Sequence, residues 1–437
     1  MATPAPDATS LSPEERNRQL RRAVVASAVG TAIEWYDFFL YGVAAALVFP
    51  SKFFPAADPY VGALLSFSTY FVGFLARPLG AAIFGHVGDR VGRKASLVAT
   101  LLLMGVATAG IGLVPAYDSI GIWGAVLLTF ARVLQGIGVG GEWGGSVLLA
   151  AEWSDRRRRG LMASWPQWGA PAGLVLANGA VSAASALSGD AFTTWGWRVP
   201  FLASVVLVIV GFWIRTGILE TPAFAKRRAE GQVEKAPVVE VVRRHGKEIA
   251  LTALLRTGQQ APFYIFSTWL LTYGTKTLGL PREMFLNAVM IAATVSLITI
   301  PIWGHLSDRV GRRRLVLLGC ALMVVFPFAY FQLIDSRAVG LIVLAAVLGQ
   351  AIHDIQYGPQ AALIAESFPG RLRYSGASLG YQLASITAGG PAPMIAVWLE
   401  HRYGSSTAIA AYLSLAALVS LASVWFLPDR SHAELEE

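Results

Sequence analysis

The chain has 437 residues, of which 55% are hydrophobic and only 14% are charged. Soluble domains carry about a quarter charged residues, so this composition excludes an ordinary soluble protein and favours a membrane protein. The formal net charge of +8 would suggest nucleic-acid binding in a soluble chain, but no nucleic-acid partner is expected here, because the basic residues follow a membrane topology. The single cysteine, Cys320, lies in an apolar run, so a buried thiol is expected and no intramolecular disulfide can form.

Twelve apolar segments are long enough to cross a bilayer, which takes about 20 residues per helix. The polar residues 1–20 lack the basic region and cleavage site of a secretory signal, so the first segment is expected to be retained. The sequence therefore predicts an all-α integral membrane protein. In chain order the segments cover residues 22–49, 60–85, 95–115, 119–150, 160–187, 197–218, 250–275, 283–305, 314–334, 338–365, 374–399 and 405–427.

The distribution of lysine and arginine predicts the orientation. If the N-terminus is cytoplasmic, the cytoplasmic tails and loops hold 26 of the 35 basic residues and the opposite loops hold five. This asymmetry follows the positive-inside rule, so both termini are predicted to be cytoplasmic. Attraction of the net positive charge to anionic lipid is a secondary consequence.

A phrase of ten residues occurs once in each half of the chain. Residues 85–94 read G-H-V-G-D-R-V-G-R-K, and residues 304–313 read G-H-L-S-D-R-V-G-R-R. A second echo is the placing of Glu152 and Glu366 seven residues before an arginine. Repeats at half-length indicate two related membrane-embedded halves, an architecture of secondary transporters.

The longest charged interruption, Glu220–Glu248, is expected to be a cytoplasmic linker between the halves. The predicted units are an N-terminal tail (1–21), a first six-helix bundle (22–219), the linker (220–249), a second six-helix bundle (250–427) and a C-terminal tail (428–437).

The repeated phrase is similar to the signature between the second and third helices of each half in the major facilitator superfamily. Arg132–Gly140, R-V-L-Q-G-I-G-V-G, resembles the fourth-helix signature of its proton-coupled members. Within the superfamily the chain most resembles the metabolite:proton symporters, and among these the shikimate-type branch, over roughly residues 22–427. The residues that carry this finer resemblance are Gly30–Phe39, Tyr41–Gly42, Phe53–Pro55, Gly140–Gly145, Gly196–Phe201, Gly279–Glu283 and Tyr374–Gln382.

The resemblance implies twelve transmembrane helices in two pseudo-symmetric six-helix bundles, with a proton as coupling ion and no cofactor. Relatives carry α-ketoglutarate, citrate, or proline and betaine, so the family leaves the substrate open. The osmosensing proline and betaine member has a long C-terminal coiled coil. This sequence ends at residue 437, shortly after its last predicted helix, which counts against that role.

Charged residues inside a spanning helix cost roughly 2.5–3.5 kcal/mol each on insertion, so they are functional candidates. Asp37 and Glu34 share one face of the first helix, and Arg132 lies at a similar depth on the fourth. The resemblance implies that such an acid and arginine meet, so Asp37 is predicted to carry the proton and Arg132 to pair with it; a static ion pair is the alternative. Glu34 is a second proton-coupling candidate or the structural partner of Arg77. Glu142 lies among glycines spaced four apart, so it either takes part in proton coupling or packs helices.

Seven polar residues inside the apolar segments are candidates for binding substrate: Arg256, Gln260, Tyr264, His353, Gln356, Gln167 and Gln382. The first three lie four residues apart on one side of the seventh helix, and the planar guanidinium of Arg256 suits a carboxylate. A gate or ion-pair role for Arg256 is the alternative. His353 is either a hydrogen-bonded core residue or a substrate contact or proton relay. The two glutamines that come last occupy equivalent places in the halves and either touch substrate or join helices.

Eight charged residues near helix ends recur between the halves: Asp89, Arg93, Glu152 and Arg159 in the first, and Asp308, Arg312, Glu366 and Arg373 in the second. The resemblance implies a cytoplasmic charge clasp that stabilises one conformation. Positive-inside charges alone explain the arginines but not the repeated aspartates.

The sequence predicts a proton-coupled symporter that imports a small organic carboxylate such as shikimate by alternating access. It is expected to work as a monomer in the cytoplasmic membrane of a bacterium, with a small organic anion or zwitterion, protons and the lipid bilayer as partners. The alternatives are an α-ketoglutarate-, citrate-, betaine- or proline-type symporter, a proton antiporter that exports a small molecule, and a non-transporting nutrient receptor. An enzyme is not expected, since no nucleotide-binding glycine loop, metal-ligand cluster or nucleophile triad is found.

Overall fold

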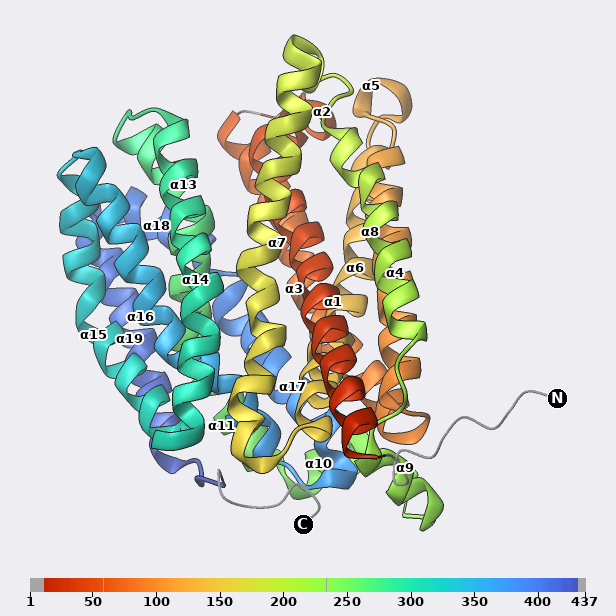
Figure 1. The fold of residues 1–437 in the computed structure, drawn as a ribbon. Coiled ribbons are helices and arrows are strands. Elements are labelled where there is room, and N and C mark those ends of the chain that lie inside the picture. Colours follow the sequence, from red (N-terminus) through yellow and green to blue (C-terminus); the bar gives the residue numbers. More distant parts are fainter. Residues whose placement is uncertain (1–11, 58, 233, 431–437) are drawn as a thin grey trace.

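The first half of the chain forms six long helices that run between two opposite faces of the molecule (Figure 1). The computed structural model describes residues 12–57, 59–232 and 234–430, and within these ranges there are helices and no strand. The six are α1 (Pro13–Leu47), α3 (Pro59–Arg90), α4 (Arg93–Leu113), α6 (Trp123–Trp153), α7 (Arg159–Ser188) and α8 (Arg198–Thr216). They are joined by the short α2 (Phe49–Phe53), α5 (Tyr117–Ile120), η1 (Arg156–Arg158) and η2 (Gly189–Phe192).

The second half contains four continuous long helices and two interrupted ones. The continuous helices are α14 (Arg282–Val310), α15 (Arg312–Asp335), α16 (Val339–Glu366) and α19 (Ser406–Phe426). The first interrupted run consists of α11 (Gly246–Leu255), α12 (Thr257–Tyr264), the π-helical η3 (Ile265–Trp269), α13 (Leu270–Thr272) and the π-helical η4 (Tyr273–Thr277). The second consists of η5 (Gly370–Leu372), α17 (Arg373–Ala384), the π-helical η6 (Ser385–Gly389) and α18 (Ala392–Tyr403).

Ten of the described helices are long and apolar enough to cross a membrane. The two interrupted runs complete the twelve spans, so the predicted all-α fold with twelve helices is confirmed. In a π-helical turn the backbone hydrogen bonds span five residues instead of four, and such turns occur frequently at functional sites. The seventh and eleventh spans therefore differ physically from the straight helices around them.

The boundaries of the polar segments differ from the predicted ones. Helix α1 begins at Pro13 rather than at residue 22, because Ser12 and Glu15 form a capping box that starts the helix before its apolar part. Residues 1–11 of the predicted N-terminal tail and 431–437 of the C-terminal tail lie outside the described residues. The predicted linker contains α9 (Pro222–Ala229), α10 (Pro237–Arg244) and the start of α11.

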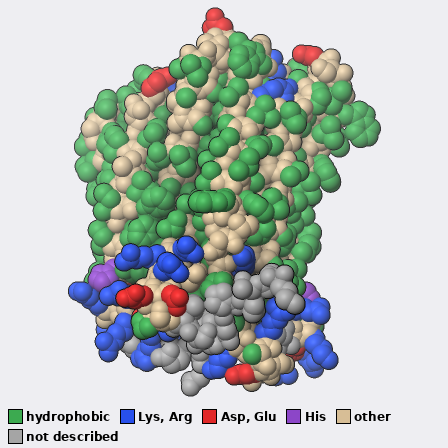
Figure 2. Space-filling model, turned by 45° about the vertical axis from the view of Figure 1, so that its right-hand side comes forward, with side chains coloured by type: hydrophobic (Ala, Val, Ile, Leu, Met, Phe, Trp, Pro, Cys, Tyr) green, Lys and Arg blue, Asp and Glu red, His purple; other side chains and the backbone are tan. Residues whose placement is uncertain are grey.

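The start of α1, the end of α19 and both linker helices lie at one end of the molecule, which we call the terminal face (Figure 1). The opposite end, with α2 and α5, is the distal face. Lysine and arginine side chains gather at the terminal face, and apolar side chains cover the middle of the molecule (Figure 2). Val106, Trp213 and Val325 are 72%, 77% and 69% exposed, which fits contact with lipid rather than water.

The halves meet along pseudo-equivalent helices. Helix α7 of the first half packs against α14 and α16 of the second, and α17 of the second packs against α3 and α6 of the first. Figure 1 shows α7 beside α14. The interface between the halves thus runs through helices that carry the repeated phrase or its partners.

Both copies of the repeated phrase place a glycine between two helices in a conformation that other residues avoid. Gly92 lies between α3 and α4 with φ 134° and ψ 158°, and Gly311 lies between α14 and α15 with φ 100° and ψ 138°. A residue with a β-carbon is strained in this region of backbone conformation, which is therefore essentially restricted to glycine. These turns bring Arg93 and Arg312 to the first position of the following helix.

Candidate functional site

A cluster of charges closes the terminal face on the first half. Arg93 donates hydrogen bonds to Asp89 at 2.9 Å and to Glu152 at 3.3 Å, and all three side chains are buried. Asp89 also crosses to the second half, where its Oδ2 accepts from the backbone N–H of Ser375 at 2.9 Å and from its hydroxyl at 2.8 Å. Ser375 lies in the first turn of α17, so a carboxylate of one half caps a helix of the other.

The second half repeats this arrangement in reverse. Arg312 lies 3.0 Å from Asp308 and 3.2 Å from Glu366. Asp308 accepts from the backbone N–H groups of Gly160 at 2.7 Å and Leu161 at 3.0 Å, in the first turn of α7. The two aspartates of the repeated phrase therefore make equivalent bonds to opposite halves.

One ion pair joins the two clusters. Arg159 of the first half contacts Glu366 of the second at 3.0 Å, and both side chains are 2% exposed. Arg373, the counterpart of Arg159, donates to the carbonyls of Ala365 and Phe368 at 3.1 Å. The structure thus brings all eight predicted gate residues to the interface at the terminal face. We call the set Asp89, Arg93, Glu152, Arg159, Asp308, Arg312, Glu366 and Arg373 the clasp; its switching role remains a prediction.

The linker contacts the clasp, which sequence patterns did not indicate. Thr221 donates to Glu152 at 2.5 Å, and the ring of Phe224 lies 5.3 Å from the guanidinium of Arg93. Glu220 accepts from the backbone N–H of Lys94 at 3.2 Å, and burial raises the pKa of its carboxyl. Helix α9 therefore covers the clasp of the first half.

Asp37 and Arg132 are connected through two intermediate residues rather than by a direct ion pair. Arg132 donates to Gln135 Oε1 at 2.6 Å, Gln135 Nε2 donates to the hydroxyl of Thr108 at 2.7 Å, and Thr108 donates to Asp37 Oδ2 at 2.7 Å. The predicted direct contact is wrong because Thr108, on α4, stands between α1 and α6. Each of these three hydrogen bonds is donated in the direction of Asp37. Arg132 therefore acts on the carboxylate of Asp37 through a relay of hydrogen bonds that all point the same way.

Sequence reasoning missed Thr108 but had a signal for Gln135, which lies three residues after Arg132 on the same helical face. Aromatic rings complete the surroundings: the guanidinium of Arg132 lies 4.4 Å from the ring of Tyr41 and 4.8 Å from that of Tyr70. The other oxygen of Asp37, Oδ1, has no hydrogen-bond partner among the described residues. Oδ1 of Asp37 is therefore an acceptor atom at the end of the relay that no described donor occupies.

Glu34 is buried and its Oε2 has no hydrogen-bond partner in the described part of the chain. The guanidinium of its predicted partner Arg77 lies instead over the rings of Phe74 and Phe38, at 4.5 and 4.7 Å. Cation–π contacts of this kind hold an arginine without a carboxylate. The predicted Glu34–Arg77 ion pair is therefore absent among the described residues.

Glu142 forms an ion pair that the sequence did not indicate. Its Oε1 accepts from Arg215 and from Ser146 at 2.9 Å, and its Oε2 accepts from Thr100 at 2.8 Å. Arg215 lies near the end of α8 and is only 2% exposed, because its long side chain reaches back into the bundle. A carboxylate held by three donors joins α4, α6 and α8, which favours the packing role over the proton role.

A second hydrogen-bonded chain lies in the other half. Arg256 donates to Gln259 Oε1 at 3.1 Å, and the amide nitrogen of Gln259 lies 2.7 Å from His353 Nε2. His353 Nδ1 lies 3.0 Å from Asp354, which accepts from Thr299 at 2.5 Å. A guanidinium can only donate, so the amide oxygen must face Arg256 and the NH2 group must face the imidazole. His353 Nε2 then accepts from Gln259, and Nδ1 donates to Asp354.

Three of the predicted substrate residues, Arg256, Gln167 and Gln382, lie in the buried centre and not in one open pocket. Arg256 also donates to the carbonyl of Tyr381 at 2.9 Å, with its guanidinium 3.1 Å from the centroid of that ring. The same ring stacks on Trp143 of the first half, whose indole donates to Gln167 at 2.7 Å. Gln382 donates to the carbonyl of Val139 at 3.3 Å. The Tyr381–Trp143 stack and the Gln382–Val139 hydrogen bond join the halves in the buried centre.

Three more of the predicted residues lie around the seventh span. Gln260 donates to Ser385 at 3.2 Å, while its Oε1 and the hydroxyl of Tyr264 have no partner within the described ranges. Gln356 accepts from Cys320 at 3.2 Å and donates to a backbone carbonyl at 3.3 Å, which makes it a packing residue here. Buried unpaired polar atoms are costly, so Gln260 and Tyr264 are the residues of this set best placed to meet a ligand.

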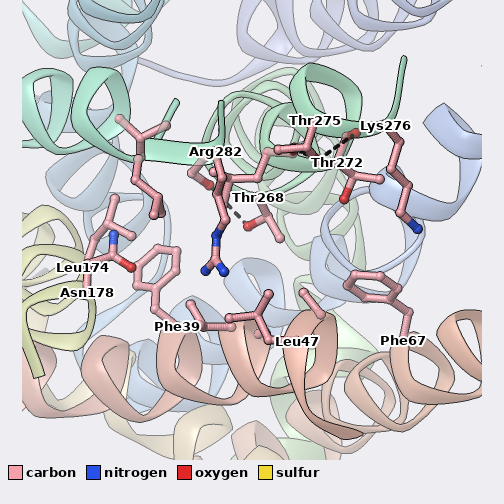
Figure 3. Close-up of a pocket in the computed structure, with 17 residues that line it drawn as sticks. Phe39, Leu47, Phe67, Leu174, Asn178, Thr268, Thr272, Thr275, Lys276 and Arg282 are labelled. Carbon is pink, nitrogen blue, oxygen red and sulfur yellow. Dashed lines mark hydrogen bonds between the residues drawn. The ribbon is translucent and has the colours of Figure 1, made fainter. Parts of the chain in front are cut away.

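A cavity of about 160 Å³ lies between the halves near the distal face (Figure 3). We call it the distal cavity; its lining includes Phe39, Gly42, Leu47, Phe67, Leu174, Asn178, Thr268, Thr272, Thr275, Lys276, Arg282 and Val289. None of the seven predicted substrate residues lines it. The site found by sequence and the space found in the structure are therefore different places along one interface.

Comparison with known proteins places this architecture in a family. The family model of the Major Facilitator Superfamily matches residues 27–386. The chain is 41% identical to the inner membrane metabolite transport protein YhjE of Escherichia coli strain K12, covering 98% of this chain and 99% of that protein. It is 39% identical to the shikimate transporter of the same strain, covering 98% and 100%.

A solved structure agrees with this result at the level of the fold. The proton:xylose symporter XylE bound to 6-bromo-6-deoxy-D-glucose superposes with a TM-score of 0.77 at 18% identity, covering 97% of this chain and 98% of that chain. The protein is thus a membrane transporter rather than an enzyme, and the chain belongs to the Major Facilitator Superfamily.

Proposed function

We propose that the chain is a proton-coupled symporter that imports a small organic carboxylate, shikimate foremost, by alternating access across a bacterial inner membrane. The observation that carries the proposal is the relay from Arg132 to Asp37 in the membrane interior. A buried carboxylate without donors is very costly in its ionised form. Breaking the relay would therefore make Asp37 bind a proton, and re-forming it would release that proton.

The relay joins three helices, so helix movement can make and break it. Asp37 lies on α1, Thr108 on α4 and Gln135 on α6. Helix α1 packs within the first half, but its rings Trp35 and Phe38 contact Phe263 and Tyr264 of the second half, so rocking of the halves changes the contacts of α1. Proton uptake and conformational change then depend on the same four side chains, as coupling requires.

The conformation supports import from the distal side. The clasp closes the terminal face, whereas the two cavities of about 160 and 490 Å³ lie between the halves near the distal face. By the positive-inside rule, the terminal face is cytoplasmic and the distal face is periplasmic. In this state, substrate and proton would arrive from the periplasm.

A carboxylate substrate is supported by the chemistry of the buried centre. The guanidinium of Arg256 donates to Gln259 and to the carbonyl of Tyr381 in this structure and would exchange these bonds for a carboxylate. The unpaired Oε1 of Gln260 and hydroxyl of Tyr264 follow on the same face of the seventh span. Guanidinium groups bind carboxylates through two parallel hydrogen bonds, and the amide and phenol suit hydroxyl groups. The shikimate transporter, a relative over nearly the whole chain, adds support for a hydroxylated carboxylate.

The test uses purified protein in liposomes with an alkaline interior and labelled shikimate outside. We expect accumulation above the external concentration, which a protonophore abolishes, and competition by related hydroxylated carboxylates. Uptake that ignores the pH gradient would overturn proton coupling. Competition by betaine or proline but by no carboxylate would replace the proposed substrate with the zwitterion alternative.

A further inference from the structure

The distal cavity has two unlike walls. The first half contributes mostly apolar side chains, among them Phe39 and Leu174, with Asn178 as its one polar side chain (Figure 3). The second half contributes hydroxyl groups and two cations, Lys276 and Arg282, beside three apolar residues, and none of the residues lining this cavity is acidic. An amphipathic space of this kind fits a ligand that has an apolar face and a negative edge.

Basic side chains such as Lys276 and Arg282 are rare on the distal side of the protein. Of the five basic residues expected in distal loops, Lys276 and Arg282 both line this single cavity. In Figure 3, Arg282 extends from α14 toward Phe39, beside the hydroxyl of Thr268. Lys276 also lines an adjoining cavity of about 490 Å³, so it stands where the two spaces meet. The lining of that second cavity also includes one acid, Glu400, which accepts a hydrogen bond from Thr277.

The size of the distal cavity restricts the ligand. Its volume of about 160 Å³ is close to that of cavities of roughly 150 Å³ that hold one benzene molecule. A single six-membered ring with a carboxylate therefore matches the size of this cavity, and a larger molecule would have to extend into the adjoining space. Thr268 and Thr272 offer hydroxyl groups to polar substituents on such a ring.

Aromatic side chains separate this cavity from the buried centre. Phe39 lines the cavity and lies 6.0 Å from Phe263, which in turn lies 5.4 Å from Trp35 and 5.4 Å from His353. The space beneath, bordered by Phe263 and Gln350, measures only about 10 Å³. It is too small for a ligand, so the distal cavity is a separate site in this conformation.

We propose that the distal cavity is an outer binding station for a ring-sized monocarboxylate anion. Arg282 binds the carboxylate, the ring packs on Phe39 and Leu47, and Lys276 draws the anion in from the adjoining space. The aromatic layer then opens to pass the ligand to the buried centre near Arg256. This inference rests on the proposed function for the identity and direction of the substrate.

The first test measures initial rates of shikimate uptake over a range of concentrations for Arg282→Gln. The matched control is Arg402→Gln, a distal-face arginine on α18 that lines neither cavity. We expect the KM of Arg282→Gln to rise about tenfold with little change in the maximal rate, because one charge-assisted pair is lost before the coupled step. Arg282→Lys should fall between the two. Equal KM values for Arg282→Gln and Arg402→Gln would overturn the outer station.

A second measurement does not depend on the stability of that variant. Leu47→Cys places a thiol in the wall of the cavity, and the native Cys320 is fully buried. We expect saturating shikimate to slow maleimide labelling of Leu47→Cys, and the uncharged methyl ester to slow it much less. Equal labelling with and without shikimate in a protein that transports it would refute the station alone. Absence of any carboxylate transport by the wild-type protein would instead refute the proposed function.

Discussion

Replacing Asp89 by asparagine removes the charge through which the first half caps helix α17 of the second. The carboxylate accepts from the backbone N–H of Ser375 at 2.9 Å, from its hydroxyl at 2.8 Å and from the N–H of Tyr374 at 3.4 Å. Asparagine keeps one acceptor oxygen and loses the charge. The intact bonds hold the terminal face closed, so Asp89→Asn should favour its opening.

The expected size follows from these bonds. A hydrogen bond to a charged group contributes about 1.5–3 kcal/mol, and the variant loses the equivalent of about one such bond across the halves. A loss of about 2 kcal/mol corresponds to a population of the open terminal face that is about 30 times larger. Arg93 keeps its contact with Glu152, so the first half should stay folded.

Cysteine accessibility measures this population. Ser378 lies on α17 one turn inside Ser375, is fully buried and adjoins Gly144 of α6, so Ser378→Cys is shielded while the halves touch. We expect maleimide labelling of this thiol to be about 30-fold faster when Asp89→Asn is added. The control is Asp155→Asn, an exposed acid on the same face that pairs with exposed Arg16 of its own half at 3.8 Å. Equal labelling rates in the two backgrounds would refute the closing role of the clasp.

Three further outcomes are expected. Glu142→Gln should lower the free energy of unfolding by about 3–5 kcal/mol, because it leaves the buried charge of Arg215 without its carboxylate. Thermal unfolding of this variant is compared with that of the double variant Glu142→Leu/Arg215→Met, which removes both charges. Equal stability of the two variants would contradict the ion pair. Gly311→Ala should cost about 1–3 kcal/mol through its positive φ, compared in the same assay with Gly340→Ala, whose position has open space and helical φ. Arg256→Lys should weaken shikimate binding about tenfold in calorimetry because the fork is lost, and unchanged affinity in a stable variant would rule out the carboxylate clamp.

Apolar runs and charge asymmetry were sufficient to predict the fold. Hydrocarbon thickness fixes the length of each span, so twelve runs gave twelve helices with ends close to the observed ones. The start of α1 escaped this reasoning because the helix continues into water, where a capping box rather than hydropathy sets its beginning. The π-helical turns of the seventh and eleventh spans also leave no mark in hydropathy.

The sequence predicted some of the site residues and missed others. Repetition singled out the charged residues of the clasp, and the family resemblance implied that they lie together at the terminal face. Depth along a helix placed Asp37 and Arg132 at one level but gave no rotation about the axis, so the intervening Thr108 was missed. The distal cavity was invisible because ordinary Thr, Leu and Phe residues from several helices form it, without a pattern along the chain.

The central claim is that Asp37 couples protons to transport, and one comparison tests it most directly. Proteoliposomes containing Asp37→Asn are assayed for uptake driven by a pH gradient and for exchange of preloaded shikimate without a gradient. We predict that gradient-driven accumulation is lost while exchange continues, since the amide can accept from Thr108 but cannot bind and release a proton. Accumulation equal to that of the wild-type protein would contradict the account.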